Sequence, residues 1–151
     1  QHVCFDYKND INKNSKSGII IGDDCMFAAD VLVRSSDAHP ILEYPSLRHL
    51  NESTKSVVIE EHVWIAARAS ILKNLTVGAN SIVAFSTVVT KDIPKYSVAK
   101  GNPMFVSSFE GRLWQRAFTQ KSESMALKYY KKYEHVADNL RSNQSNKMGK
   151  L

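Results

Sequence analysis

The sequence predicts an all-β solenoid, in which short parallel strands repeat around a prism, with one ejected loop and a helical tail at the C-terminus. Three observations predict it: a six-residue repeat, one interruption of that repeat, and a change to helix-like spacing of apolar residues near the end of the chain. The chain has 151 residues, enough to bury a core. A hydrophobic fraction of 43% and a charged fraction of 23% argue against wholesale disorder.

The repeat runs without a break from Ile59 to Pro94, and an earlier block, 21–38, keeps the same spacing. A period of six fits neither an α-helix nor a β-meander, but it fits a short strand followed by a corner. Three units then close one triangular coil of about 18 residues, and coils stack at the spacing of neighbouring strands. We expect the residue after each first-position aliphatic, which is often small, to let the backbone turn the corner. The first-position residues themselves should point inward and stack; in the unbroken block these are Ile59, Ile65, Ile71, Val77, Val83 and Val89.

The interruption covers residues 39–58, where two prolines and several polar residues replace the six-residue pattern. We expect a loop ejected from a corner of the prism, with Val57 and Val58 leading into the next strand. Long excursions from a compact domain usually carry function. Residues 1–108, including this loop, are therefore expected to form one solenoid domain.

The six-residue pattern ends after Pro94. Residues 96–100 are expected to form one more strand, followed by a turn at 101–103. From Phe109 the spacing of apolar residues becomes helical, which predicts a basic α-helical extension over residues 109–151. Ser122 or Ser124 is expected to cap its second helix. The two expected apolar faces are Leu113, Trp114, Ala117 and Phe118, and Met125, Tyr129, Val136 and Leu140.

The formal net charge of +5 comes from this extension. Residues 1–109 hold 11 basic and 11 acidic residues, whereas residues 110–151 hold 9 basic and 4 acidic ones. A basic segment of this kind can bind nucleic acid, an anionic membrane surface or an anionic polymer. The alternative is a helix face that is simply exposed to solvent. No apolar run approaches the ~20 residues of a membrane helix, and no signal-peptide pattern opens the chain. With Cys4 and Cys25 as its two cysteines, the chain is expected to be a cytoplasmic protein with reduced thiols.

Three segments around the loop resemble the hexapeptide-repeat acyltransferases, and most of all their branch that O-acetylates capsular and other surface polysaccharides. They are Arg-Ser-Ser-Asp-Ala-His-Pro-Ile at 34–41, Leu50-Asn51, and Val-Ile-Glu-Glu-His-Val-Trp-Ile at 58–65. The resemblance covers about residues 17–108. It implies a left-handed parallel β-helix, an exception to the usual right-handed crossover. It also implies acetyl transfer from acetyl-CoA to a sugar hydroxyl, without a metal. The implied partners are two further copies in a homotrimer, with active sites at the subunit interfaces, and a carbohydrate acceptor, not nucleic acid.

Three residues are candidates for catalytic roles: the resemblance points to His39 and Trp64, and Asp37 is a candidate because it lies two residues before His39. His39 matches the catalytic histidine, and an alcohol attacking a thioester needs a base, for which histidine is the usual choice near neutral pH. Asp37 would orient the imidazole or hold the substrate, or else simply fix the loop. Trp64 would stack on a sugar or on the pantetheine arm, or pack within the trimer. His49 in the loop and His62, expected to face solvent, would contact sugar or be ordinary polar residues.

Four positions match the family's coenzyme A groove: Ala67, Phe85, Thr90 and Lys91. Lys91 would bind phosphate as a point charge. The chain departs from its relatives at Phe85, where a small residue is usual, and at Glu60, where glycine is usual. Phe105 and Ser108 stand where two cations are common, which weakens the expected phosphate contacts unless Lys95, Lys100 or Arg112 substitutes.

Other functions remain open on the same fold. One is an amino-sugar N-acetyltransferase, and another is an acetyltransferase for serine, maltose or an antibiotic. A metal enzyme like the β-helical carbonic anhydrases would need three converging histidines. A trimeric scaffold that has lost acyl-CoA binding is the non-catalytic alternative.

Overall fold

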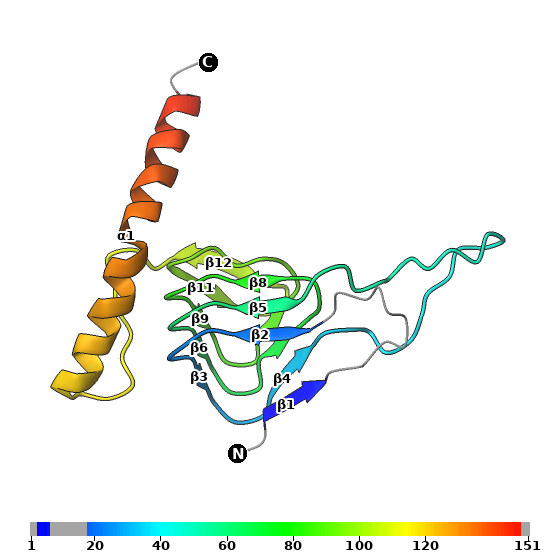
Figure 1. Cartoon of the computed structure of the whole chain (residues 1–151), viewed down its shortest axis with the longest axis horizontal. Helices are drawn as coiled ribbons and strands as arrows, with labels where there is room; N and C mark the ends of the chain where they lie inside the picture. The colour runs from blue at the N-terminus through cyan, green and yellow to red at the C-terminus, as the bar shows by residue number, and fades with distance from the viewer. Residues whose placement is uncertain (1–2, 7–17, 149–151) are drawn as a thin grey trace. The chain divides into compact units, whose positions relative to one another are not determined.

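The computed structural model describes residues 3–6 and 18–148. Its short strands form three sheets, and the chain steps from one sheet to the next, which is the arrangement of a parallel β-helix (Figure 1). Sheet A contains β1 (Val3–Asp6), β4 (Val31–Arg34), β7 (Ser70–Ile71) and β10 (Val88–Val89). Sheet B contains β2 (Ile19–Ile21), β5 (Val57–Ile59) and β8 (Thr76–Val77). Sheet C contains β3 (Met26–Phe27), β6 (Trp64–Ile65), β9 (Ile82–Val83), β11 (Ser97–Lys100) and β12 (Phe105–Ser108).

The register of the parallel strands confirms the predicted repeat. Ile65 aligns with Val83, and Ile71 aligns with Val89, one coil apart in each case. All four side chains are completely buried. Burying an aliphatic side chain of this size contributes roughly 1.5–3 kcal/mol, so the inward stack holds successive coils in line. β1 pairs with β4, which places residues 3–6 in an earlier coil.

The corners differ from the expectation that the small second residue turns the backbone. The left-handed conformation falls on the fourth residue in seven of the nine units, and the φ angles there lie between 54° and 61°. These residues are Asp24, Asp30, His62, Arg68, Asn74, Asn80 and Ser86. The second residue is small for another reason, because the next coil passes close to it. A Cβ on Gly78 would lie 2.4 Å from the backbone nitrogen of Lys95.

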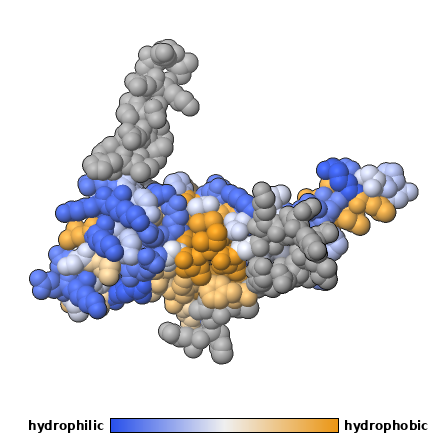
Figure 2. Space-filling model, viewed as in Figure 1, coloured by the Kyte–Doolittle hydropathy of each residue, from blue (hydrophilic) through white to orange (hydrophobic). Residues whose placement is uncertain are grey.

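The chain leaves the prism after β4 and returns at β5, so that residues 35–56 form a projecting loop (Figure 1). The predicted bounds, 39–58, differ at both ends, because β4 ends at Arg34 and because Val57 and Val58 belong to β5. The loop is a hairpin, with an antiparallel bridge between Leu42 and His49. The backbone N–H of Leu50 donates to the Ile41 carbonyl at 2.8 Å, which pairs the two arms closer to the prism. Hydrophobic side chains are visible on the projecting loop in Figure 2, and the exposed ones include Ile41, Leu42 and Leu47.

The end of the β-helix follows the expected order of strand and turn. β11 continues sheet C, the chain turns at residues 101–104, and β12 runs back antiparallel to β11. The described chain then divides, between Glu110 and Gly111, into two compact units. The second unit contains α1 (Gln120–Met148). No described helix is both long enough and apolar enough to cross a membrane.

The expectation of helix from Phe109 onward was wrong for residues 109–119, which are turns and irregular structure. Trp114 is buried whereas Phe118 is fully exposed, so the two do not share one apolar face. The helix cap is Thr119, whose Oγ1 accepts a hydrogen bond from the backbone N–H of Ser122 at 3.2 Å. The predicted cap, Ser122 or Ser124, lies inside the helix.

Candidate functional site

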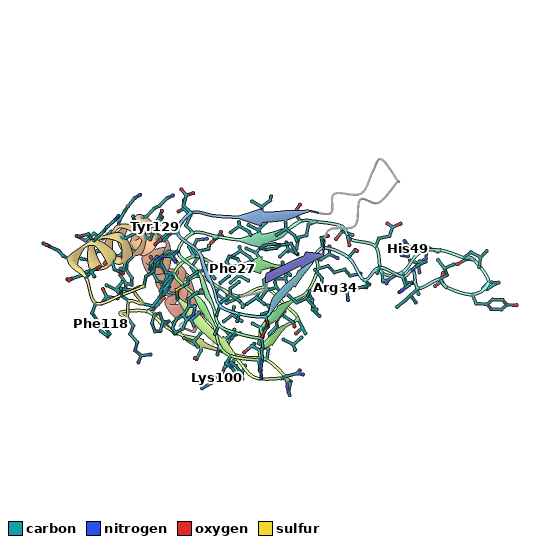
Figure 3. The ribbon with its side chains drawn as sticks, turned by 90° about the horizontal axis from the view of Figure 1, so that it is seen from below. Phe27, Arg34, His49, Lys100, Phe118 and Tyr129 are labelled. Atoms are coloured by element: carbon teal, nitrogen blue, oxygen red, sulfur yellow. The ribbon has the colours of Figure 1, made fainter. Side chains whose placement is uncertain are left out.

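The base of the loop encloses a small pocket of about 150 Å³. Its outgoing arm contributes Asp37 and His39, and its returning arm contributes Asn51 and His49, which is labelled in Figure 3. The pocket therefore brings two of the predicted catalytic residues together with a second histidine. The complete lining is Ser36, Asp37, Ala38, His39, Pro40, His49, Asn51 and Ser53.

His39 is held through its backbone. Its N–H donates to the Asp37 carbonyl at 2.8 Å, and its own carbonyl accepts from Asn51 Nδ2 at 3.0 Å. The side chain is exposed, and within the described residues its ring makes no hydrogen bond. Both ring nitrogens are therefore available to a substrate while the backbone that carries the ring is fixed.

Asp37 is bound to the prism and not to the His39 ring. Its Oδ2 accepts from Lys73 Nζ at 2.5 Å and from Asn51 Nδ2 at 2.9 Å. The hydrogen bond from Lys73 lowers the pKa of the Asp37 carboxyl below its ordinary value, and partial burial, which acts in the opposite direction, does not cancel that effect. The carboxylate therefore fixes the loop to the body of the protein.

Lys73 was not identified from the sequence. It follows β7 at the corner between sheets A and B, and its Nζ also donates to the backbone carbonyl of Asn51. The repeat contains a signal that could have found it: with β7 aligned on β10, Lys73 occupies the same place in its coil as Lys91 does in the next. Residues beside the corner where the chain leaves the prism can reach the loop.

His49 and His62 lie in different surroundings. His49 Nε2 is 2.9 Å from Asn51 Oδ1, and its Nδ1 is 3.3 Å from Glu52 Oε1. The expectation that His62 faces solvent was wrong, because its side chain is buried and its Nδ1 lies 2.7 Å from Asp24 Oδ2. Asp24 occupies the corresponding corner of the preceding coil, so it supplies the polar partner that a buried imidazole needs.

The predicted coenzyme A residues lie at two different corners of the prism. Thr90 and Lys91 follow β10 at the corner between sheets A and B, where His39 also leaves the prism, and both are exposed. Ala67 and Phe85 lie at the corner between sheets C and A, one coil apart, and the Ser86 N–H donates to the Ala67 carbonyl at 3.0 Å.

Phe85 is exposed and lies under the Arg68 guanidinium, at 5.7 Å from Arg68 Cζ to the ring centroid. Trp64 is partly buried on β6 in sheet C, between Met26 and Ile82. Within this chain, Trp64, Ala67 and Phe85 therefore do not lie at the corner that leads to His39. Among the described residues, no group of three or more His, Cys, Asp or Glu side chains could hold a metal ion.

Residues 56–91 match the family model of the bacterial transferase hexapeptide, with six repeats. The β-helix of this chain is built from hexapeptide repeats of the bacterial transferase type. The chain is 38% identical over 108 residues to the polysialic acid O-acetyltransferase of Escherichia coli O1:K1 / APEC, a match that covers 72% of this chain and 34% of the relative. The chain therefore spans about a third of the length of that hexapeptide-repeat relative.

Two solved structures share this hexapeptide-repeat fold. The polysialic acid O-acetyltransferase OatWY matches with a TM-score of 0.65 and 30% identity, over 74% of this chain and 54% of that chain. A galactoside acetyltransferase in complex with coenzyme A matches with a TM-score of 0.53 and 27% identity, over 68% of this chain and 50% of that chain. The predicted left-handed parallel β-helix is thereby confirmed.

Proposed function

We propose that this chain is part of an O-acetyltransferase that moves the acetyl group of acetyl-CoA to a hydroxyl of a sugar in a capsular or other surface polysaccharide. The observation that carries the proposal is the pocket at the loop base, where the His39 ring makes no hydrogen bond in the described part of the chain and its backbone is bound on both sides. A base that is positioned but uncommitted is what the attack of an alcohol on a thioester requires.

In the proposed reaction, a ring nitrogen of His39 takes the proton of the sugar hydroxyl as its oxygen attacks the acetyl carbonyl. A backbone N–H near Ala67 stabilises the oxyanion of the tetrahedral intermediate. The intermediate then collapses, the carbon–sulfur bond breaks, and the leaving thiolate of coenzyme A takes the proton back from His39. The products are the acetylated sugar and free coenzyme A, and neither cysteine forms an acyl-enzyme.

A homotrimer would complete the site. Ala67 and Phe85 lie at the corner between sheets C and A, whereas His39 and Lys91 lie at the corner between sheets A and B. The groove between two protomers can bring one corner of each together, which a single prism cannot do. Acetyl-CoA would then lie along this groove with its phosphates near Lys91. The solved structure of the galactoside acetyltransferase with coenzyme A supports this choice of co-substrate.

The proposed acceptor is an anionic polysaccharide. Two relatives are named for polysialic acid, which is a polyanion, and residues 110–151 carry an excess of basic residues. Positive charge on a protein attracts an anionic polymer and raises its local concentration. The cytoplasmic location expected from the sequence stays a prediction.

Thiol release from acetyl-CoA tests the function directly. Polysialic acid, a galactoside and an amino sugar serve as acceptors, and mass spectrometry of the product identifies an ester or an amide. We expect ester formation with polysialic acid, and its loss in His39→Ala, with the oligomeric state unchanged by light scattering. Near-normal turnover of His39→Ala would overturn the role of His39, and amide formation alone would point to an N-acetyltransferase. Release of thiol with none of the acceptors, in a protein that does not bind acetyl-CoA by calorimetry, would point to a scaffold.

A further inference from the structure

Asn51 lines the pocket and contacts both arms of the loop. Its Nδ2 donates to Asp37 Oδ2 at 2.9 Å and to the His39 carbonyl at 3.0 Å. Its Oδ1 accepts from the backbone N–H of Ile41 at 2.7 Å and lies 2.9 Å from His49 Nε2. The segment 37–41, which carries the His39 ring, is therefore bound at three points by one side chain of the returning arm.

The amide of Asn51 can satisfy these four contacts in one orientation. A flipped amide would set Nδ2 against the Ile41 N–H, and Oδ1 against the Asp37 carboxylate and the His39 carbonyl, so donors would meet donors and acceptors would meet acceptors. In the observed orientation His49 Nε2 carries the proton that it donates to Oδ1. Two amide hydrogens and two lone pairs are then all used, so Asn51 has no hydrogen-bonding capacity left for a sugar.

Asn51 is itself held by the prism. Lys73 donates to its backbone carbonyl and also to the Asp37 carboxylate. Lys73 therefore connects the prism to the His39 segment through two groups, the Asp37 carboxylate and the Asn51 carbonyl. Because Asp37 and Asn51 are fixed in this way, they limit how far the His39 side chain can move.

We propose that Asn51 is a positioning residue, which acts through the His39 backbone to hold the imidazole at the pocket and does not touch the acceptor. This inference rests on the proposed function, in which His39 is the base. Its physical basis is that a misplacement of a reacting group by about 1 Å can cost on the order of 100-fold in rate.

Asn74 provides a matched control. It is also an asparagine that clamps the loop: its Oδ1 accepts from the N–H groups of Thr54 and Lys55 at 2.9 and 3.2 Å, and its Nδ2 donates to the Glu52 carbonyl at 3.2 Å. None of these contacts reaches residues 37–41. Because Asn74 has a φ of 60°, Asn74→Gly removes the contacts without straining the backbone.

The kinetic test compares Asn51→Ala, Asn51→Asp and Asn74→Gly with the unmodified protein. We expect both Asn51 variants to lower kcat by about 10- to 100-fold with little change in KM for acetyl-CoA, because the loss is one of orientation. Asn51→Asp keeps the shape but has no donors, so it should be as slow as Asn51→Ala, while Asn74→Gly should stay within about twofold. The double variant His39→Ala/Asn51→Ala should be no slower than His39→Ala. A kcat of Asn51→Ala equal to that of Asn74→Gly, or a further loss in the double variant, would overturn the proposal.

Two measurements decide the question even if the protein acetylates none of the acceptors tried. The Ile41 amide should exchange its hydrogen faster in Asn51→Ala than in the unmodified protein or in Asn74→Gly, and the His39 ring signals in NMR spectra should shift or broaden in Asn51→Ala alone. Unchanged Ile41 exchange and unchanged His39 signals would refute the positioning role, whereas absence of transfer by the unmodified protein would refute the proposed function.

Discussion

The Lys73 ammonium lies 2.5 Å from the Asp37 carboxylate, although 36 residues separate the two in the sequence. Lys73 belongs to the prism and Asp37 to the outgoing arm of the loop. The ion pair therefore ties the segment that carries His39 to the rigid body of the β-helix. The first prediction concerns this pair.

Asp37→Asn should lower stability near neutral pH and have little effect in acid. Because Lys73 lowers the pKa of Asp37 below 3.8, the pair contributes stability that is fully present above that pH and is lost as the pH falls through the folded-state pKa. The Asp37 side chain is 46% exposed, so the effect should not exceed about 1 kcal/mol. Thermal unfolding of both proteins over a pH series measures the difference. A gap that stayed constant from neutral pH into acid would contradict the assignment.

Gly78→Ala should destabilise the β-helix. The added Cβ would lie 2.4 Å from the Lys95 nitrogen and 2.6 Å from the Pro94 carbonyl carbon, and neither backbone atom can move without displacing the next coil. A cost of about 1–3 kcal/mol in the free energy of unfolding is expected from overpacking of this kind.

Gly18→Ala is the control for Gly78→Ala. The nearest atom to its added Cβ would be the rotatable Ser56 hydroxyl oxygen, at 3.1 Å. Urea denaturation of both variants gives the comparison, and equal stabilities would show that the close approach at Gly78 has no energetic consequence.

Lys91→Ala should raise KM for acetyl-CoA and leave kcat nearly unchanged, because a phosphate contact remote from the thioester is made equally in the ground and transition states. An increase of about 3- to 10-fold is expected for loss of one exposed charge contact worth roughly 1 kcal/mol. Lys128→Ala, on α1, controls for the loss of a positive charge elsewhere in the chain. Identical KM values for the two variants would remove Lys91 from the coenzyme A site.

Binding of an anionic polymer should weaken with salt. If the basic residues of 110–151 attract the acceptor, KM for polysialic acid should rise as sodium chloride is added, because mobile ions screen exposed charges beyond about 10 Å at 0.1 M. KM for a neutral galactoside should not change. Parallel behaviour of the two acceptors would indicate that salt acts on the enzyme itself and not on steering.

The parts of the fold that the sequence predicted are those that a local rule controls. Each first-position residue must enter the prism interior, so apolar residues such as Ile65 and Ile71 recur every six residues, and the coil length follows. His39 could be placed at the edge of the loop because the six-residue repeat is interrupted from that position onward. The role of Asn51 could not be predicted, because an insertion has no period and nothing in its composition states which arm binds which corner. For Lys73, the repeat gives the position beside the corner that the loop leaves, but not the groups that the ammonium binds.

In the C-terminal extension, a helix-like spacing of apolar residues predicted a helix that does not form. The spacing of Trp114 and Phe118 satisfies a helical rule, yet the chain between Gly111 and Thr119 is not helical. Gly111 has a φ of 74°, and the side chain of Thr119 fixes the start of α1. One side-chain cap and one left-handed residue thus outweigh a short apolar pattern.

The reversal of the chain between β11 and β12 has a consequence for association. A stack of parallel rungs ends in unpaired backbone groups onto which another molecule can add. In sheet C that place is taken by β12, whose direction is opposite to that of every strand before it. A second molecule that adds a parallel rung end-on would therefore face a strand of opposite direction along this side.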